Sequence, residues 1–145
     1  MFVENLKETL NLGEKLSQKL NPQSIVLLNG PIGAGKTSFV QGIARGLSIS
    51  EDITSPTFAL SHHYRSGKIP LIHLDLYRLE NSYSAKEVFF AEEEEALQSE
   101  AILVIEWPEL IKPLIKDFWE IEISYAKNFG RNYLIRDPKN LLTFS

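Results

Sequence analysis

Residues 30–37, GPIGAGKT, match the phosphate-binding pattern G-x-x-x-x-G-K-[ST] at every specified position. The glycines let backbone N–H groups turn inward around phosphate oxygens, and Lys36 can extend its ammonium to the β- and γ-phosphates of a nucleotide. Thr37 can place its hydroxyl on Mg²⁺. This motif restricts the possible folds more than any other feature, because it binds a nucleotide only where a strand enters it and a helix leaves it.

The segments on both sides of residues 30–37 have the required patterns. Residues 24–28, SIVLL, form a continuous run that is typical of a strand buried on both faces of a parallel sheet. The loop is followed by apolar residues at helical spacing, so it lies at a helix N-terminus, where free N–H groups and the helix dipole attract anions. These apolar residues are Phe39, Val40, Ile43, Ala44 and Leu47.

Length and composition indicate one globular domain over residues 1–145, since 43% of the residues are hydrophobic and 23% charged. The absence of cysteine excludes disulfides, thiolate metal sites and cysteine nucleophiles. No apolar run approaches the roughly 20 residues needed to span a bilayer, and the N-terminus lacks the features of a signal peptide. We therefore expect a cytoplasmic protein without membrane contact, in the compartment where ATP and Mg²⁺ are available.

The net charge of −4 restricts the possible partners. A protein that holds nucleic acid mainly by neutralising phosphates needs an excess of basic side chains, which this chain does not have. We therefore expect no binding to DNA, and we expect any contact with tRNA to be indirect, through a partner protein that holds the nucleic acid.

The rest of the chain predicts elements around this strand–loop–helix unit. Asn5 and Glu8 resemble a capping box before a leucine-rich helix that ends at Asn21-Pro22; this helix is expected to cover the sheet, and its start can approach a nucleotide base. Alternating patterns predict two hairpins, in residues 58–76 and 119–136. Further predicted elements are a helix at residues 82–99, a buried strand at 101–106 and a short helix at 109–116.

Together these elements predict an α/β fold of the P-loop NTPase type. A mostly parallel central sheet is expected between helices, as a three-layer sandwich, with antiparallel additions from the two hairpins. Because ligands bind at the carboxyl ends of the strands in such sheets, polar residues at the ends of predicted strands are candidates for the functional site.

Two acidic residues, Asp75 and Glu106, lie at predicted strand ends. Mg²⁺ prefers octahedral oxygen coordination and keeps several waters, so it needs the Thr37 hydroxyl, phosphate oxygens and one nearby acid. We favour Glu106 as the metal partner or the residue that orients attacking water, because it follows the stronger buried-strand pattern, with Asp75 supporting through water. The alternative is that either acid is satisfied by backbone N–H groups or by Arg78.

Three further features have more than one interpretation. Residues 54–57, TSPT, occupy the place of a switch segment that reaches the γ-phosphate, although a plain turn has a similar pattern. The adjacent His62 and His63 point to opposite faces of a strand, which argues against a zinc site. The four acids of residues 92–95 are interpreted as a solvated helix face; the alternatives are a docking surface for a basic partner or a contribution to metal binding.

Three motifs follow the P-loop in order: SPTF at residues 55–58, HLDLYRL at 73–79 and IEWPE at 105–109. With the P-loop, they resemble the bacterial TsaE (YjeE) family over nearly the whole chain. The resemblance implies an ATPase that works with the TsaB–TsaD pair to make threonylcarbamoyladenosine beside the anticodon of tRNAs reading ANN codons. It also implies that TsaD performs the carbamoyl transfer, and that ATP hydrolysis supports its turnover.

The resemblance also implies roles for individual residues. Thr37 and Glu106 would hold Mg²⁺. The implied catalytic residues are Lys36, Thr57, Asp75, Glu106 and Trp107, of which Thr57 is the switch-like one. The implied nucleotide-binding residues are Ile32, Gly33, Ala34, Gly35, Lys36, Thr37, Ser38 and Arg131. The chain departs from the family pattern between Glu80 and Ser99, where the usual leucine–glycine turn is missing and an acidic run follows.

Two other functions fit a P-loop in a small α/β domain. A small-molecule kinase would need a pocket for a second substrate and usually several arginines in a mobile lid, and the sequence has no such arginine cluster. A nucleotide-gated binding module would bind ATP with Mg²⁺ without turnover. No strong arginine finger can be named among Arg45, Arg78 and Arg131, so we expect slow hydrolysis by the isolated protein.

Overall fold

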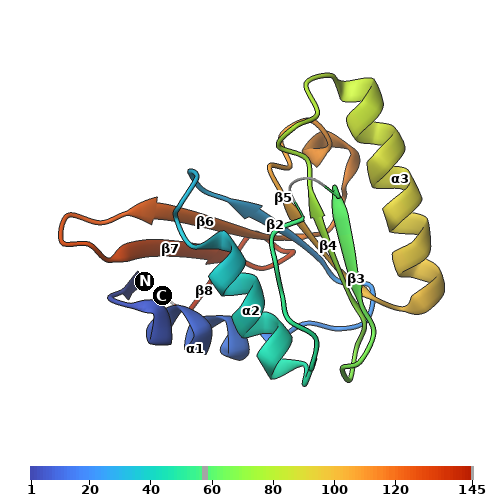
Figure 1. Ribbon diagram of the computed structural model, residues 1–145. Coiled ribbons are helices and arrows are strands. Elements are labelled where there is room, and N and C mark those ends of the chain that lie inside the picture. Colours follow the sequence, from blue (N-terminus) through green and yellow to red (C-terminus); the bar gives the residue numbers. More distant parts are fainter. Residues whose placement is uncertain (57–58, 145) are drawn as a thin grey trace.

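The structure, a computed structural model, describes residues 1–56 and 59–144, in which eight strands form one sheet with helices on both faces (Figure 1). The helices are α1 (Leu6–Ser17), α2 (Lys36–Gly46), α3 (Ser82–Ser99) and the short 3-10 helix η1 (Lys112–Leu114). The strands are β1 (Phe2–Val3), β2 (Ile25–Asn29), β3 (Ser61–Tyr64), β4 (Leu71–Asp75), β5 (Ile102–Glu106), β6 (Trp119–Tyr125), β7 (Arg131–Arg136) and β8 (Leu142–Thr143).

The sheet has the strand order β1-β7-β6-β2-β5-β4-β3, and β8 also pairs with β7. Its four central strands, β6, β2, β5 and β4, run parallel. The outer pairings are antiparallel: β3 with β4, and β7 with β6, β1 and β8. The predicted parallel centre with two antiparallel hairpins is therefore confirmed. Strands β4 and β5 are buried along their whole length, as their apolar runs require.

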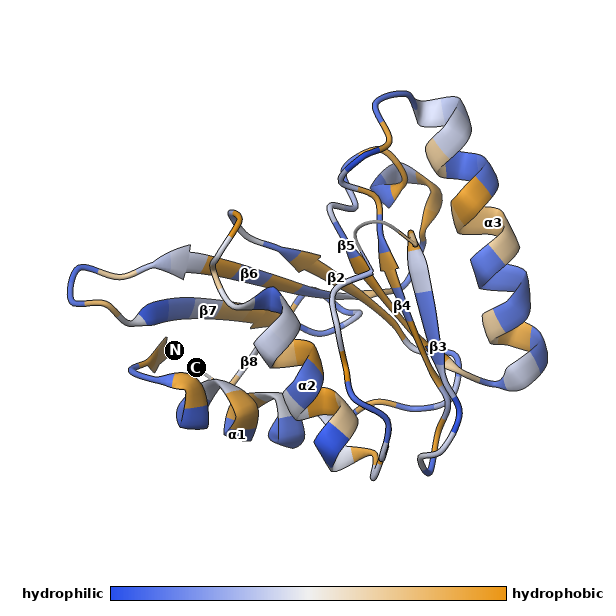
Figure 2. Ribbon diagram, viewed as in Figure 1, coloured by the Kyte–Doolittle hydropathy of each residue, from blue (hydrophilic) through white to orange (hydrophobic). Residues whose placement is uncertain are grey.

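Two apolar cores lie on opposite faces of the sheet. Along β2 the side chains alternate, so that Val26 and Leu28 join the core that contains Phe39 of α2, whereas Leu27 joins the core that contains Phe89 of α3. Figures 1 and 2 show α1 and α2 on one side of the sheet and α3 on the other, with buried strands that are mostly apolar. The predicted three-layer arrangement is confirmed.

Helices α1 and α2 approach each other through glycines. A Cβ on Gly42 would lie 2.4 Å from the carbonyl oxygen of Leu10, and a Cβ on Gly13 would lie 2.6 Å from that of Phe39. Backbone therefore packs directly on backbone where the two helices meet. Because α2 begins at the end of the phosphate-binding loop, this contact holds the helix that carries the loop against α1.

The observed elements differ from the prediction in three places. The predicted helix at residues 109–116 is reduced to the single turn of η1, since Pro113 supplies no N–H to a longer helix. Helix α1 begins after its Asn5 cap as expected but ends at Ser17, before Asn21-Pro22. The short strands β1 and β8 carry no periodic pattern that a sequence could reveal. None of the described helices is long and apolar enough to cross a membrane.

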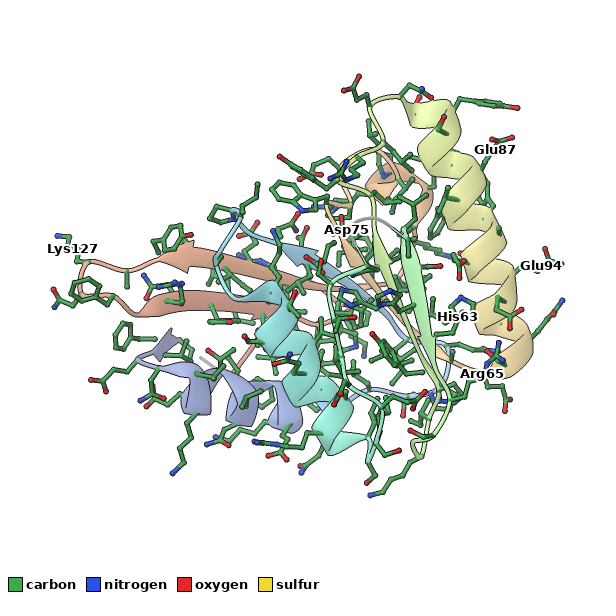
Figure 3. All side chains as sticks on the ribbon, in the orientation of Figure 1. His63, Arg65, Asp75, Glu87, Glu94 and Lys127 are labelled. Carbon is green, nitrogen blue, oxygen red and sulfur yellow. The ribbon has the colours of Figure 1, made fainter. Side chains whose placement is uncertain are left out.

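The acidic run of α3 is divided between two surfaces. Glu92 lies 2.7 Å from Nε2 of His63, and Glu95 pairs with Arg65 at 3.4 Å. Figure 3 shows His63 between β3 and α3, and Glu94 on the outer side of the helix. The interpretation as a solvated face therefore holds for Glu94 and for Glu95, whose pair with Arg65 is exposed to solvent, whereas Glu92 contacts His63 of β3.

Candidate nucleotide-binding site

The loop of residues 30–35 joins the end of β2 to Lys36, the first residue of α2. Gly33 and Gly35 have φ of +81° and +102°, a region that residues with a side chain rarely enter, so the backbone itself requires these glycines. The loop follows the carboxyl end of a parallel strand, and the first N–H groups of α2 have no partner within the helix. Such an arrangement can hold an anion.

A cavity of about 380 Å³ brings together most of the residues predicted for the site. Ser55 and Tyr77 also line it. Thr57, the predicted switch-like residue, lies outside the described residues. The predicted residues that line this cavity are Ile32, Gly33, Gly35, Lys36, Thr37, Ser38, Asp75, Glu106 and Trp107.

The two candidate acids stand side by side in the wall of this cavity. Asp75 and Glu106 are paired across β4 and β5, and each is only 3% exposed. The backbone N–H of Tyr77 donates to Oδ1 of Asp75 at 2.8 Å. Nε2 of His73, a fully buried residue of β4, lies 2.5 Å from Oε2 of Glu106. Both carboxylates are therefore held in place by partners within the sheet and its adjoining turn.

The Lys36 ammonium lies between the loop and these acids. Nζ donates to the carbonyl oxygens of Gly30 at 2.5 Å and Pro31 at 3.4 Å, and it stands 3.9 Å from the centroid of the Trp107 ring. Burial lowers the pKa of Lys36, and nearby carboxylates, of which Glu106 has the largest effect, oppose this shift. The lysine is therefore coupled electrostatically to the acids across the cavity.

The oxygen donors in the cavity suit Mg²⁺. The Thr37 hydroxyl and the carboxylates of Asp75 and Glu106 all line the same space. Proteins bind Mg²⁺ through one or two carboxylates together with phosphate oxygens and water, rather than through a complete protein cage. The residues present therefore fit a magnesium ion that shares its coordination with a bound phosphate.

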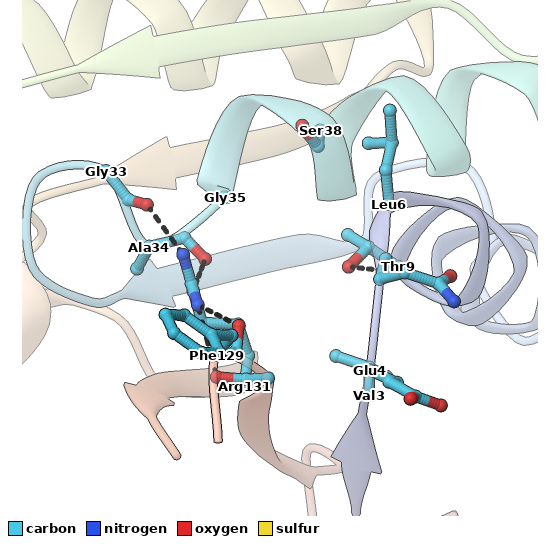
Figure 4. Close-up of a pocket in the computed structure, with 12 residues that line it drawn as sticks. Val3, Glu4, Leu6, Thr9, Gly33, Ala34, Gly35, Ser38, Phe129 and Arg131 are labelled. Carbon is cyan, nitrogen blue, oxygen red and sulfur yellow. Dashed lines mark hydrogen bonds between the residues drawn. The ribbon is translucent and has the colours of Figure 1, made fainter. Parts of the chain in front are cut away.

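A second cavity, of about 270 Å³, adjoins the loop (Figure 4). It contains Ala34 and Arg131, the two predicted nucleotide-binding residues that do not line the first cavity. The start of α1, including Asn5 and Leu6, forms part of its wall. In Figure 4 the guanidinium of Arg131 reaches the loop, where it donates to the carbonyl oxygens of Ala34 at 3.2 Å and Gly33 at 3.4 Å.

A family model described as "Threonylcarbamoyl adenosine biosynthesis protein TsaE" matches residues 3–133. The chain belongs to the TsaE family. A relative from Synechocystis, described as tRNA threonylcarbamoyladenosine biosynthesis protein TsaE, is 46% identical over 116 residues, covering 78% of this chain and 72% of the relative. A relative of the same description from Rickettsia prowazekii is 43% identical over 140 residues, covering 95% of this chain and 94% of the relative.

The TsaE assignment agrees with a comparison of whole structures. The crystal structure of YdiB from Bacillus subtilis matches with a TM-score of 0.74 and 26% sequence identity, covering 92% of this chain and 80% of that chain. The family resemblance inferred from the P-loop and the three later motifs is therefore confirmed, together with the fold class.

Three residues of this TsaE site have no role predicted from the sequence: His73 and Tyr77, which belong to the motif at residues 73–79, and Tyr125. His73 lies two residues before Asp75 in β4, and this spacing places the two side chains on the same face of the sheet. The sequence therefore contained a signal that His73 lies near the acids. Tyr77 follows Asp75 by two residues, just after the strand. The Tyr77 ring packs on Trp107 with a centroid separation of 4.8 Å. Tyr125, at the end of β6, donates from its hydroxyl to a carbonyl of the loop, and no sequence signal indicates this contact.

Proposed function

We propose that this TsaE-family chain binds Mg-ATP, hydrolyses it to ADP and phosphate, and thereby supports threonylcarbamoyladenosine modification of tRNAs that read ANN codons. The observation that carries the proposal is the convergence of the phosphate-binding loop, the Lys36 ammonium and two buried carboxylates in one cavity. The family match over residues 3–133 supports the assignment to this modification. The cytoplasm, where ATP and tRNA meet, is the proposed location.

The proposed roles follow from the chemistry of each group. The loop amides and Lys36 bind the β- and γ-phosphates and stabilise negative charge as it moves during transfer. Thr37 and Glu106 hold Mg²⁺, which when bound neutralises charge on the phosphate oxygens. Asp75, beside Glu106, acts through a water molecule. Trp107 restricts the Lys36 ammonium through its ring face.

Two proposed roles concern the edges of the site. Ser38, with Gly33 and Gly35, lines both cavities, so we assign the second cavity to the ribose and base of the nucleotide. Arg131 also lines this second cavity. Thr57 keeps its proposed role as a switch-like residue; it follows closely after Ser55, which lines the phosphate cavity.

We propose that the isolated chain hydrolyses ATP slowly and that a TsaB–TsaD pair accelerates it. Arg45 pairs with Glu14 at 2.8 Å near the far end of α2, and Arg131 is bonded to loop carbonyls, so neither serves as an arginine finger in this arrangement. A group from the partner would then complete the stabilisation of charge on the γ-phosphate. The partner also makes the contact with tRNA, in keeping with the net charge of −4.

The test is phosphate release from Mg-ATP by the chain alone and with a TsaB–TsaD pair. We expect the pair to raise the rate by more than about tenfold. Lys36→Ala should remove both ATP binding and the stimulation, because it takes away the cation that faces the phosphates. The matched control is Lys15→Ala, which removes an exposed lysine of α1 and should leave both unchanged.

Two results would change the assignment. If the wild-type chain binds Mg-ATP but releases no phosphate even with a competent pair, the chain is a nucleotide-gated binding module rather than an ATPase. If small metabolites accelerate ATP loss and the pair does not, the chain is a small-molecule kinase.

A further inference from the structure

The β6–β7 hairpin contacts the outer side of the phosphate-binding loop. We propose that Tyr125 and Arg131, which are paired across this hairpin, are positioning residues that hold the loop in its phosphate-binding conformation. This inference rests on the proposed function, because it concerns the same nucleotide site. It assigns to Tyr125 a role that no motif in the sequence indicates.

The contacts reach three consecutive carbonyl groups of the loop. The Tyr125 hydroxyl donates to the carbonyl oxygen of Ile32 at 2.8 Å. Arg131 donates from Nε to Ala34 at 3.2 Å and from Nη2 to Gly33 at 3.4 Å (Figure 4). The two side chains also support each other, since Cζ of Arg131 lies 4.5 Å from the centroid of the Tyr125 ring.

Peptide planarity converts these contacts into an orientation of the loop amides. In a trans peptide unit the C=O and the following N–H point in opposite directions. Holding the carbonyl of Ile32 toward the hairpin therefore turns the N–H of Gly33 away from it, and holding the carbonyl of Ala34 does the same for the N–H of Gly35. Both glycines line the phosphate cavity.

The need for such support comes from the glycines themselves. Gly33 and Gly35 have no side chain to restrict their backbone, so an unsupported loop would lose conformational freedom each time it bound a phosphate. Bonds that fix the loop in advance reduce that loss and so strengthen binding. The hairpin is a firm support, because β6 is hydrogen-bonded to β2, the strand that enters the loop.

The guanidinium of Arg131 makes further contacts with the hairpin itself. The remaining nitrogen of the guanidinium, Nη1, donates to the carbonyl oxygens of Phe129 at 2.8 Å and Gly130 at 3.1 Å. All three guanidinium nitrogens of Arg131 thus bind backbone carbonyls of the hairpin or the loop. Through these bonds the arginine fixes the loop backbone, as a positioning residue does.

The main test is Tyr125→Phe, which removes the hydroxyl and keeps the ring beside Arg131. We expect the Kd for Mg-ATP, measured by titration calorimetry, to rise roughly three- to tenfold, as for the loss of one hydrogen bond, with little change in kcat. Arg131→Lys, which keeps the charge and loses the forked donor, should have at least as large an effect. The matched control is Tyr83→Phe on the exposed side of α3, which should leave the Kd unchanged.

A second measurement reports on the loop without nucleotide. In Tyr125→Phe, the NMR order parameters of the Gly33 and Gly35 amides should fall below the wild-type values and recover when nucleotide saturates the protein. A wild-type Kd in Tyr125→Phe, or order parameters of the Gly33 and Gly35 amides that stay at the wild-type values in this variant, would overturn the proposal. Because the order parameters are measured without ATP, they test the loop support even if the chain proves not to hydrolyse ATP.

Discussion

Replacing Glu106 with glutamine is expected to lower partner-stimulated ATP hydrolysis by roughly a hundredfold or more, while ATP still binds. The side chain lies at the carboxyl end of β5, is 3% exposed and lines the cavity with Thr37. Glutamine has nearly the same shape but lacks the charge that Mg²⁺ requires. Its amide oxygen can still accept a hydrogen bond from His73, so the surrounding packing is kept. Phosphate release and ATP titrations with and without Mg²⁺ measure the two effects separately.

The neighbouring acids provide controls for Glu106→Gln. Asp75→Asn should lower the rate less, because Asp75 is proposed to act through water and already accepts a hydrogen bond from the backbone of Tyr77. Glu94→Gln makes the same chemical change at an exposed position on the outer side of α3, and should leave the rate near the wild-type value. A larger loss in Asp75→Asn than in Glu106→Gln would mean that the two acids have been assigned in the wrong order.

The second large effect concerns stability. Gly42→Ala is expected to lower the free energy of unfolding by about 1–3 kcal/mol, although alanine is the better helix former by about 1 kcal/mol in an exposed helix. The added Cβ would lie 2.4 Å from the carbonyl oxygen of Leu10 and 3.1 Å from the Cα of Gly13, which are backbone atoms of α1. No side-chain rotation can relieve this contact, so the helices must separate. Urea denaturation monitored by circular dichroism measures the change.

Two further variants test this reason for the destabilisation. Gln98→Ala, at an exposed position of α3, should change the unfolding free energy by less than about 0.5 kcal/mol. The double variant Gly13→Ala/Gly42→Ala should cost less than the sum of its parts, because helices already forced apart by one methyl group leave room for the other. A Gly42→Ala protein as stable as wild type would show that α1 and α2 are not held together at this point.

Much of the fold could be predicted because its signals are local. The P-loop specifies its own strand and helix, and the uninterrupted apolar run that leads to Glu106 in β5 requires burial on both faces. Parallel strands share one carboxyl edge, so the meeting of Asp75 and Glu106 followed from their places at strand ends. The order of the strands in the sheet could not be predicted from the sequence. Strand β2 lies between β5 and β6, which are distant in the chain, and no local pattern in β2 indicates these neighbours.

The unpredicted parts of the site depend on contacts between distant segments. Histidine within an apolar strand has many structural explanations, so the contact of His73 with Glu106 appears only when β4 and β5 are aligned. Tyr125 has the alternating pattern of any hairpin residue, although its hydroxyl reaches a loop 93 residues away. Gly13 lies among the leucines of α1 in the sequence, but only the packed helices show that it meets the backbone of α2 at Phe39.

The outer edge of β7 affects the tendency of this protein to aggregate at high concentration. β1 pairs with residues 131 and 132 of that strand, and β8 pairs with residues 135 and 136, so the two ends of the described chain divide one edge between them (Figure 1). A long strand edge with free N–H and C=O groups is a template on which other molecules add by strand pairing. The two short strands cover most of that template, and this edge of the sheet is thereby protected against aggregation.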